Sequence, residues 1–91
     1  MNLIEYDTMF HSEDHHWWFV GTRAVIGDFV RRATAGWTGK ARPRVLDVGC
    51  GTGATLASLK NEYSVYGVEL ERAGAQYCLR RGLKRVGRAR A

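Results

Sequence analysis

Proline, cysteine and long hydrophobic runs are all scarce in this sequence. Its 91 residues include one proline and two cysteines, and no apolar run approaches the roughly 18–20 residues that a membrane span needs. Two cysteines outside a C-x-x-C pair do not make a disulfide framework, which fits a reducing compartment. No basic-then-apolar leader begins the sequence. These features argue against a disulfide-built secreted domain and against a membrane protein, and they predict a soluble, cytoplasmic protein.

Acidic residues are missing from the last twelve positions. Six of the 14 Lys and Arg residues lie there, which leaves 8 basic against 9 acidic side chains in the rest of the chain. These six are Arg80, Arg81, Lys84, Arg85, Arg88 and Arg90. A basic tail can attract phosphate without sequence preference, but charge alone gives no base readout. We therefore expect a solvated basic end and do not expect nucleic acid as a partner.

The first part of the chain has helical periodicity. A short helix is predicted around residues 3–10, and a longer one from Trp17 to about Ala35, ended by Gly36-Trp37-Thr38-Gly39. The apolar positions of the longer helix fall on one stripe, made of Thr22, Val25, Ile26, Phe29, Val30 and Ala33. This spacing predicts that the stripe is the packed side of the helix.

Strands and helices alternate after Pro43. Strands are predicted over 45–48 and 63–70, with the start of a third at 83–86. Helices are predicted from about 53 to 60, with Leu56 and Leu59 inward, and over 71–81. The first strand is almost entirely apolar, which is typical of a strand covered on both faces.

This alternation predicts an α/β fold with right-handed crossovers and a parallel sheet. Specifically, we expect the N-terminal part of a doubly wound, Rossmann-like sheet, truncated after about two to three strands. Residues 1–39 would form an N-terminal helical segment, and residues 40–91 a partial nucleotide-binding domain.

Three glycines at alternate positions, Gly49, Gly51 and Gly53, follow the first strand and open a helix. Glycine tolerates a positive φ and lets a ligand approach the backbone. The N-terminus of the following helix directs free N–H groups toward the same place. The segment therefore predicts a nucleotide-binding turn.

Two acidic residues flank this turn. Asp47 lies in the buried strand, where a carboxylate is unfavourable unless it is paired, and dinucleotide-binding loops usually have an apolar residue there. Glu69 ends the second strand, where a carboxylate can accept both hydroxyls of a ribose. A nicotinamide or flavin protein remains open, because Gly49, Gly51 and Ala54 also satisfy G-x-G-x-x-A.

The string V-L-D-V-G-C-G-T-G at 45–53, followed by G-V-E-L at 67–70, resembles the first two motifs of class I S-adenosylmethionine-dependent methyltransferases. The resemblance implies that S-adenosylmethionine is the cofactor, with Glu69 on its ribose and Leu70 beside its adenine. It places the methionine part of the cofactor against Asp47, Gly49, Cys50, Gly51, Thr52 and Gly53. Alternatively, Gly67 only eases strand packing, and Cys50 is a small buried residue rather than a nucleophile.

His16-Trp17-Trp18-Phe19, followed by Arg23, resembles a segment found ahead of the glycine loop in one bacterial group of these enzymes. By that resemblance, the aromatic residues, Trp18 among them, pack a lid helix on the cofactor site. Arg23 would then reach the carboxylate of the ligand, a sensible pairing for a guanidinium. Alternatively, the aromatic residues are core anchors.

A metal site is not expected. His11 and His15 would share a helix face, with Glu13 and Asp14 nearby, but no Cys pair or second His motif completes a tetrahedral set.

The resemblance implies in-line transfer of a methyl group from a sulfonium to an acceptor, with the protein supplying position and electrostatics. No catalytic residue and no acceptor can be named, because acceptor-binding residues of the family come from later strands. The chain is therefore expected to be a fragment that holds part of the cofactor site. Open alternatives are a NAD/FAD-type Rossmann module, and a non-catalytic interaction fragment with a basic tail that complements another chain.

Overall fold

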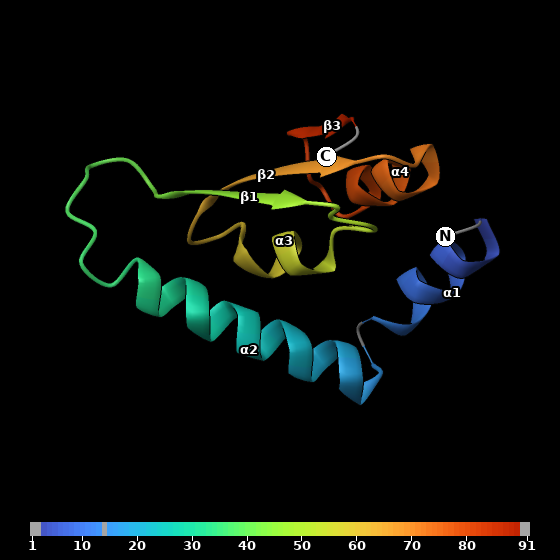
Figure 1. Ribbon diagram of the computed structural model, residues 1–91, viewed down its shortest axis with the longest axis horizontal. Coiled ribbons are helices and arrows are strands. Elements are labelled where there is room, and N and C mark those ends of the chain that lie inside the picture. Colours follow the sequence, from blue (N-terminus) through green and yellow to red (C-terminus); the bar gives the residue numbers. More distant parts are fainter. Residues whose placement is uncertain (1–2, 14, 90–91) are drawn as a thin grey trace.

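The computed structural model describes residues 3–13 and 15–89, and after two N-terminal helices the strands alternate with helices (Figure 1). The elements are α1 (Leu3–Ser12), α2 (Trp17–Ala33), β1 (Arg44–Val48), α3 (Ala54–Leu59), β2 (Ser64–Glu69), α4 (Arg72–Arg80) and β3 (Val86–Arg88). The predicted order is confirmed, including the short first helix. Over this part of the chain, no helix combines the length and apolarity needed to cross a membrane. Asp14 and Arg90 lie outside the described residues.

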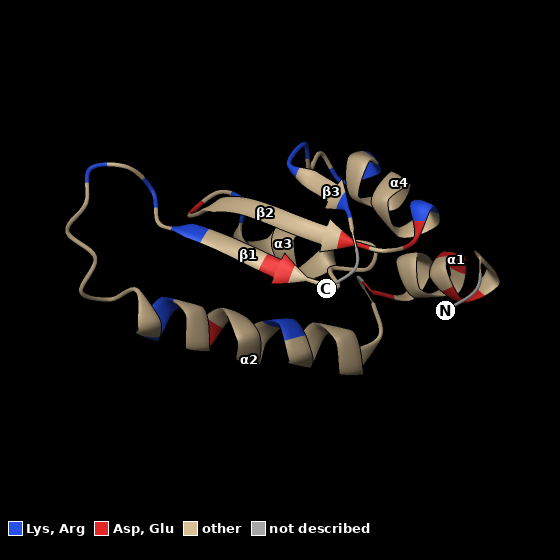
Figure 2. Cartoon of the chain, turned by 45° about the horizontal axis from the view of Figure 1, so that its top comes forward, with Lys and Arg blue, Asp and Glu red and all other residues tan. Residues whose placement is uncertain are grey.

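The strands form one parallel sheet in the order β1-β2-β3. Val45 lies opposite Val65 and Asp47 opposite Gly67, and Gly67 in turn lies opposite Val86. Parallel strands end at the same edge of a sheet, so the turn after β1 lies beside the end of β2. This confirms the predicted α/β class and brings the two acidic positions to one edge, where Figure 2 shows acidic segments at the ends of β1 and β2.

The hydrophobic core lies on one face of the sheet. Leu56 and Leu59 of α3 are buried, as predicted, and pack with Val65 of β2 and the fully buried Cys78 of α4. Two right-handed crossovers that progress in the same direction along the sheet place both helices on the same face.

The prediction that β1 is covered on both faces is wrong. Leu46 is 60% exposed and Val48 is 53% exposed, whereas Val45 and Asp47 on the other face are partly buried. Because α3 and α4 share one side of the sheet, no helix among the described residues covers the side that bears Leu46 and Val48.

Helix α2 ends at Ala33 and presents a different side to the core than its apolar stripe predicts. Val25 and Phe29 of that stripe are exposed, while Gly27 is buried and Val30 packs against the core. Just after the helix, the hydroxyl of Thr34 shares a 2.7 Å hydrogen bond with that of Tyr63. Contact with α3 and the segment after it therefore fixes which side of α2 faces inward, and most of the stripe remains exposed.

Among the basic residues at 80–89, Arg80, Lys84, Arg85 and Arg88 are exposed, as predicted for a solvated end, whereas Arg81 is not. Arg81 pairs with Glu13 at 3.2 Å, and only 11% of its side chain is exposed. The guanidinium of Arg80 lies 4.7 Å from the centre of the Phe10 ring, and that of Arg85 lies over Tyr66.

Gly67 offers a test of the packing between sheet and α3. An ideal Cβ there would lie 2.8 Å from Cys50 Sγ and 2.9 Å from Leu56 Cδ1. We expect Gly67→Ala to lower the free energy of unfolding by about 1–3 kcal/mol in urea denaturation, because overpacking forces neighbours to shift. Gly87→Ala is the control, since a Cβ there meets nothing within 4 Å. Equal losses in the two variants would contradict this packing.

Candidate functional site

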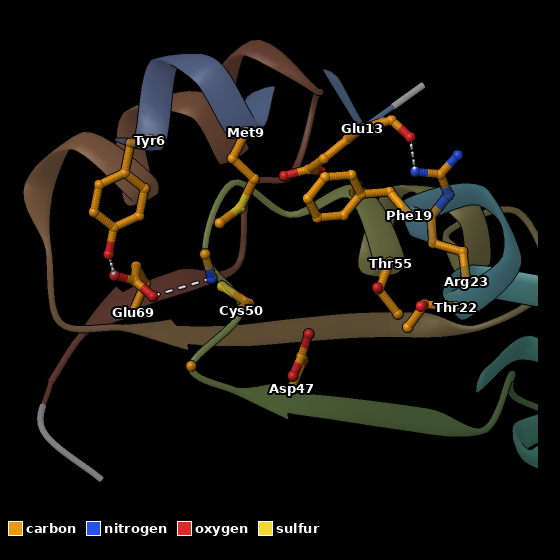
Figure 3. Close-up of a pocket in the computed structure, with 13 residues that line it drawn as sticks. Tyr6, Met9, Glu13, Phe19, Thr22, Arg23, Asp47, Cys50, Thr55 and Glu69 are labelled. Atoms are coloured by element: carbon orange, nitrogen blue, oxygen red, sulfur yellow. Dashed lines mark hydrogen bonds between the residues drawn. The ribbon is translucent and has the colours of Figure 1, made fainter. Parts of the chain in front are cut away.

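A cavity of about 270 Å³ lies at the carboxyl ends of β1 and β2 (Figure 3). We call it the loop pocket. Its floor is the turn at 49–51 with Asp47, Glu69 and the start of α3, and helices α1 and α2 supply its other walls. The lining residues from these two helices and the turn between them are Tyr6, Met9, Glu13, Phe19, Thr22 and Arg23. Strand ends, glycine turn and N-terminal helices therefore converge on one cavity.

The turn has the conformation that its glycines predict. Gly49, Gly51 and Gly53 have φ values of 77°, 57° and 86°, a region that disfavours other residues. A Cβ at Gly49 would meet nothing within 4 Å, and one at Gly51 only the Met9 sulfur at 3.8 Å. These two glycines leave room for a ligand against the backbone. Gly53 instead packs on Leu83 and Cys78, so its role is in packing.

Asp47 lines the loop pocket from the next-to-last position of β1. Burial raises the pKa of its carboxyl above the ordinary value, because the charged form loses hydration. Among the described residues, no hydrogen-bond or ion-pair partner holds this carboxylate. A partly buried anion of this kind favours a cationic ligand in the cavity.

Glu69 is buried at the end of β2 and accepts three hydrogen bonds. Its Oε1 accepts from Gly51 N at 3.0 Å, and its Oε2 accepts from Tyr6 Oη at 2.6 Å and from Glu71 N at 2.9 Å. Burial alone would raise the pKa of Glu69, but these donors hold it below its ordinary value. The ionised carboxylate therefore stabilises the folded chain at neutral pH, and this contribution is lost as pH falls through the lowered pKa.

Tyr6 and Gly74 are site residues that sequence reasoning missed. Tyr6 is 5% exposed, and burial, together with its hydrogen bond to Glu69, raises the pKa of its hydroxyl. Gly74 lies where a Cβ would come within 3 Å of Glu69 Cγ and of Gly51 O, so α4 can lie directly on the turn. Neither residue belongs to a recognisable local pattern, because their partners are distant in the sequence.

Glu13 fastens the segment between α1 and α2 to the glycine loop and α4. It is 4% exposed, accepts a hydrogen bond from the hydroxyl of Thr52, and pairs with Arg81. Arg23 lines the loop pocket, and its Nη1 donates to the main-chain carbonyl of Glu13. Sequence reasoning considered Glu13 only as a neighbour of a metal site, and the described residues contain no group of three or more His, Cys, Asp or Glu arranged to hold a metal.

The remaining predicted site residues lie outside the lining of the loop pocket. Thr52 is turned to Glu13, and Leu70 is 48% exposed just beyond Glu69. Trp18 is 58% exposed and lies with Trp17 on the outer side of α2, beside Val25 and Ile26. The alternative that these two tryptophans are core anchors is wrong, because both side chains are exposed in this structure; only Phe19, of the three aromatics, reaches the cavity.

Solved structures agree with this fold and define the class of protein. The chain aligns over 99% of its length with 36% of DesVI from Streptomyces venezuelae, at 22% identity and a TM-score of 0.66. It aligns equally completely with 35% of CalS10, at 27% identity and a TM-score of 0.65. CalS10 is a SAM-bound amino pentose methyltransferase from Micromonospora echinaspora involved in calicheamicin biosynthesis. The chain therefore has the fold of the first part of a Rossmann-like methyltransferase domain, and it spans about a third of the structures that it matches.

The sequence comparison identifies the family. The model of the family described as methionine biosynthesis protein MetW matches residues 35–89. This match covers more than half of the chain, which therefore belongs to the MetW family. The resemblance to class I S-adenosylmethionine-dependent methyltransferases is thereby confirmed. A comparison with curated proteins finds no significant match.

Replacing Glu13 tests whether it fastens the N-terminal segment. In Glu13→Ala, the largely buried guanidinium of Arg81 keeps its hydrogen bond to Thr52 O but loses this carboxylate, so we expect the free energy of unfolding to fall by about 3 kcal/mol, with faster amide hydrogen exchange in α1. The control is Glu62→Ala, which removes the ion pair with Arg31. About half of each side chain in that pair is exposed. We expect a much smaller change there, and similar effects of the two variants would contradict the assignment.

Proposed function

We propose that the chain binds S-adenosylmethionine in the loop pocket and acts as the cofactor-binding part of a methyltransferase. The observation that supports this best is the pair of carboxylates, Asp47 and Glu69, on either side of a glycine turn that leaves space against its backbone. The SAM-bound CalS10, which shares this fold, and a family described by methionine biosynthesis agree with a ligand derived from methionine.

The methionine part of the ligand carries an ammonium and a carboxylate, and the pocket offers a partner for each. Asp47, whose carboxylate has no described partner, faces the ammonium. Arg23 has five N–H donors, of which Nη1 already serves Glu13, and its remaining donors are available to the ligand carboxylate. The turn at Gly49, Cys50 and Gly51 lines the same pocket and lies against the methionine part of the ligand.

Glu69 accepts the ribose hydroxyls, and this requires Tyr6 to move. Each carboxylate oxygen has about two acceptor positions. Both positions on Oε2 are taken, by Tyr6 and Glu71, whereas Oε1 has one left. A ribose that binds both oxygens must therefore replace the phenol, and Tyr6 occupies the place of a ribose hydroxyl in the free chain.

The cofactor, once bound, supplies a methyl group on a sulfonium for in-line transfer to an acceptor. The residues of this chain hold and orient the cofactor, and Met9 and Phe19 cover the turn from the side of α1 and α2. Four further residues belong to the proposal although they do not line the pocket. Trp18 is proposed at the lid and Leu70 beside the adenine. Thr52 and Gly53 support the turn from the side away from the pocket. A complementing chain and a cytoplasmic location stay predictions.

A dinucleotide is a weaker candidate for the same pocket. A pyrophosphate needs N–H donors and positive charge around it, whereas Asp47 and Glu69 both direct negative charge toward the cavity. Nucleic acid is weaker still, since Arg80, Arg81 and Arg85 already lie against aromatic or acidic partners within the chain.

Asp47→Asn separates a ligand-binding role from a structural one. We expect S-adenosylhomocysteine to bind about tenfold to a hundredfold more weakly to the variant in calorimetric titration, because hydrogen bonds to charged groups contribute about 1.5–3 kcal/mol. In the free chain the same variant should raise the free energy of unfolding at neutral pH, because the raised pKa of Asp47 means that its ionised form opposes folding. Wild-type affinity falls as pH drops through that raised pKa, and the variant lacks this dependence.

The matched control is Asp28→Asn, which alters an exposed carboxylate paired with Arg32 on α2 and leaves the affinity unchanged. Binding of NADH but not of S-adenosylhomocysteine would contradict the proposed function, as would equal affinities in wild type and Asp47→Asn.

A further inference from the structure

The two cysteines of the chain lie against each other. Cys50 is in the glycine turn and Cys78 is on α4, and their sulfur atoms are 3.8 Å apart. Both are free and buried, Cys78 completely and Cys50 with 9% of its surface exposed. Twenty-eight positions separate them in the sequence, so the fold brings together the two thiols that the chain has.

The two thiols differ in access. Cys50 lines the loop pocket and Cys78 does not, so a small oxidant that enters the pocket meets Cys50 first. Cys78 has a single S–H, which can be directed at Cys50 Sγ or at Gly51 O, 3.3 Å away. The hydrogen bond from Cys78 lowers the pKa of the Cys50 thiol, and the same hydrogen bond and burial raise the pKa of Cys78. A sulfur that lines a pocket and has the lower pKa, beside a fully buried one, is the arrangement of an attacking and a resolving cysteine.

We propose that Cys50 and Cys78 form a reversible internal disulfide that closes the loop pocket to its ligand. With hydrogen peroxide as oxidant, the Cys50 thiolate attacks one peroxide oxygen. The O–O bond breaks, and the leaving hydroxide takes up a proton to become water. The sulfur of Cys78 then attacks the resulting sulfenic acid, the S–O bond breaks, and a second water leaves. Two thiols and one peroxide thus become one disulfide and two waters, and a dithiol reductant reverses the change.

Disulfide formation must deform the turn. A disulfide has an S–S length of about 2.05 Å, whereas the sulfurs are now 3.8 Å apart, so the two sulfurs must approach by about 1.8 Å. Cys78 has little freedom, because it is fully buried in the hydrophobic core with Leu56, Leu59 and Leu83. The movement therefore falls on the turn, where Cys50 N donates to Val68 O and Gly51 N donates to Glu69.

Ligand binding and oxidation oppose each other in this arrangement. This part of the proposal rests on the proposed function: a cofactor in the loop pocket covers Cys50, and a disulfide withdraws Gly51 from Glu69.

Two alternative roles of the cysteine pair make different predictions. A metal would need further ligands, and the described residues offer no such group. Plain core packing leaves both thiols inert. In a reducing compartment a disulfide of this kind is transient and regulatory.

The test is intact-mass measurement of the full chain after treatment with hydrogen peroxide at a few equivalents. We expect a mass lower by two hydrogen atoms, a Cys50–Cys78 peptide in a non-reducing digest, and complete reversal by dithiothreitol. Excess S-adenosylhomocysteine slows the reaction. Two free thiols after treatment, or a disulfide only between chains, would overturn the proposal.

Two further measurements complete the test. Circular dichroism first checks that Cys78→Ala is folded. In this variant, peroxide should leave Cys50 as a sulfenic acid that dimedone traps. Trapping to the same extent in wild type would contradict the resolving role of Cys78. Oxidised wild type should bind S-adenosylhomocysteine at least tenfold more weakly than reduced wild type, and equal affinities would overturn the switch. If the internal disulfide forms but the reduced chain binds no S-adenosylhomocysteine, the proposed function fails while the covalent step stands.

Discussion

The carboxylate of Glu69 joins four parts of the fold, and the shape of the loop pocket depends on it. It ends β2, accepts the backbone N–H of Gly51 in the glycine turn and of Glu71 at the start of α4, and accepts the hydroxyl of Tyr6 on α1. Those donors keep it ionised although it is 5% exposed. A buried carboxylate needs such donors, so the turn and both helices are held where the charge is stabilised.

The N-terminal segment is held to the same edge by contacts of mixed kinds. Tyr77 of α4 donates to Asp7 at 2.6 Å and stacks on Phe10 at 4.5 Å between ring centres, while Glu13 joins Arg81 and Thr52. The polar contacts place Tyr6 and Glu13 beside the glycine turn, and the aromatic contact fixes α1 on α4. Tyr6 and Glu13 therefore form part of the pocket wall in the free chain, whereas Trp17 and Trp18, predicted to pack a lid, are exposed outside it.

Local sequence determines the strand, the glycine turn and the following helix, so the positions of Asp47, Gly49, Gly51 and Glu69 could be predicted. Tyr6 and Glu13 could not, because their partners lie 63 and 68 positions away and no periodic pattern marks them. Burial was mispredicted where it depends on what covers a surface. The apolar faces of β1 and α2 have strand and helical periodicity, respectively, whether or not another element covers them. Leu46 of β1 and Phe29 of α2 are both exposed in this structure. Arg81 is withdrawn from solvent although the sequence predicts a solvated basic end, because its acidic partner Glu13 comes from another segment.

The most direct test is the affinity of Tyr6→Phe for S-adenosylhomocysteine, measured beside wild type by calorimetry at neutral pH. If the phenol occupies the position of a ribose hydroxyl on Glu69, its removal frees that position, and binding should tighten by roughly tenfold. This equals about 1.4 kcal/mol, close to the contribution of one hydrogen bond to a charged group. The same variant should be less stable without ligand. Unchanged or weaker binding by Tyr6→Phe would contradict the account of Glu69 as the ribose-binding carboxylate.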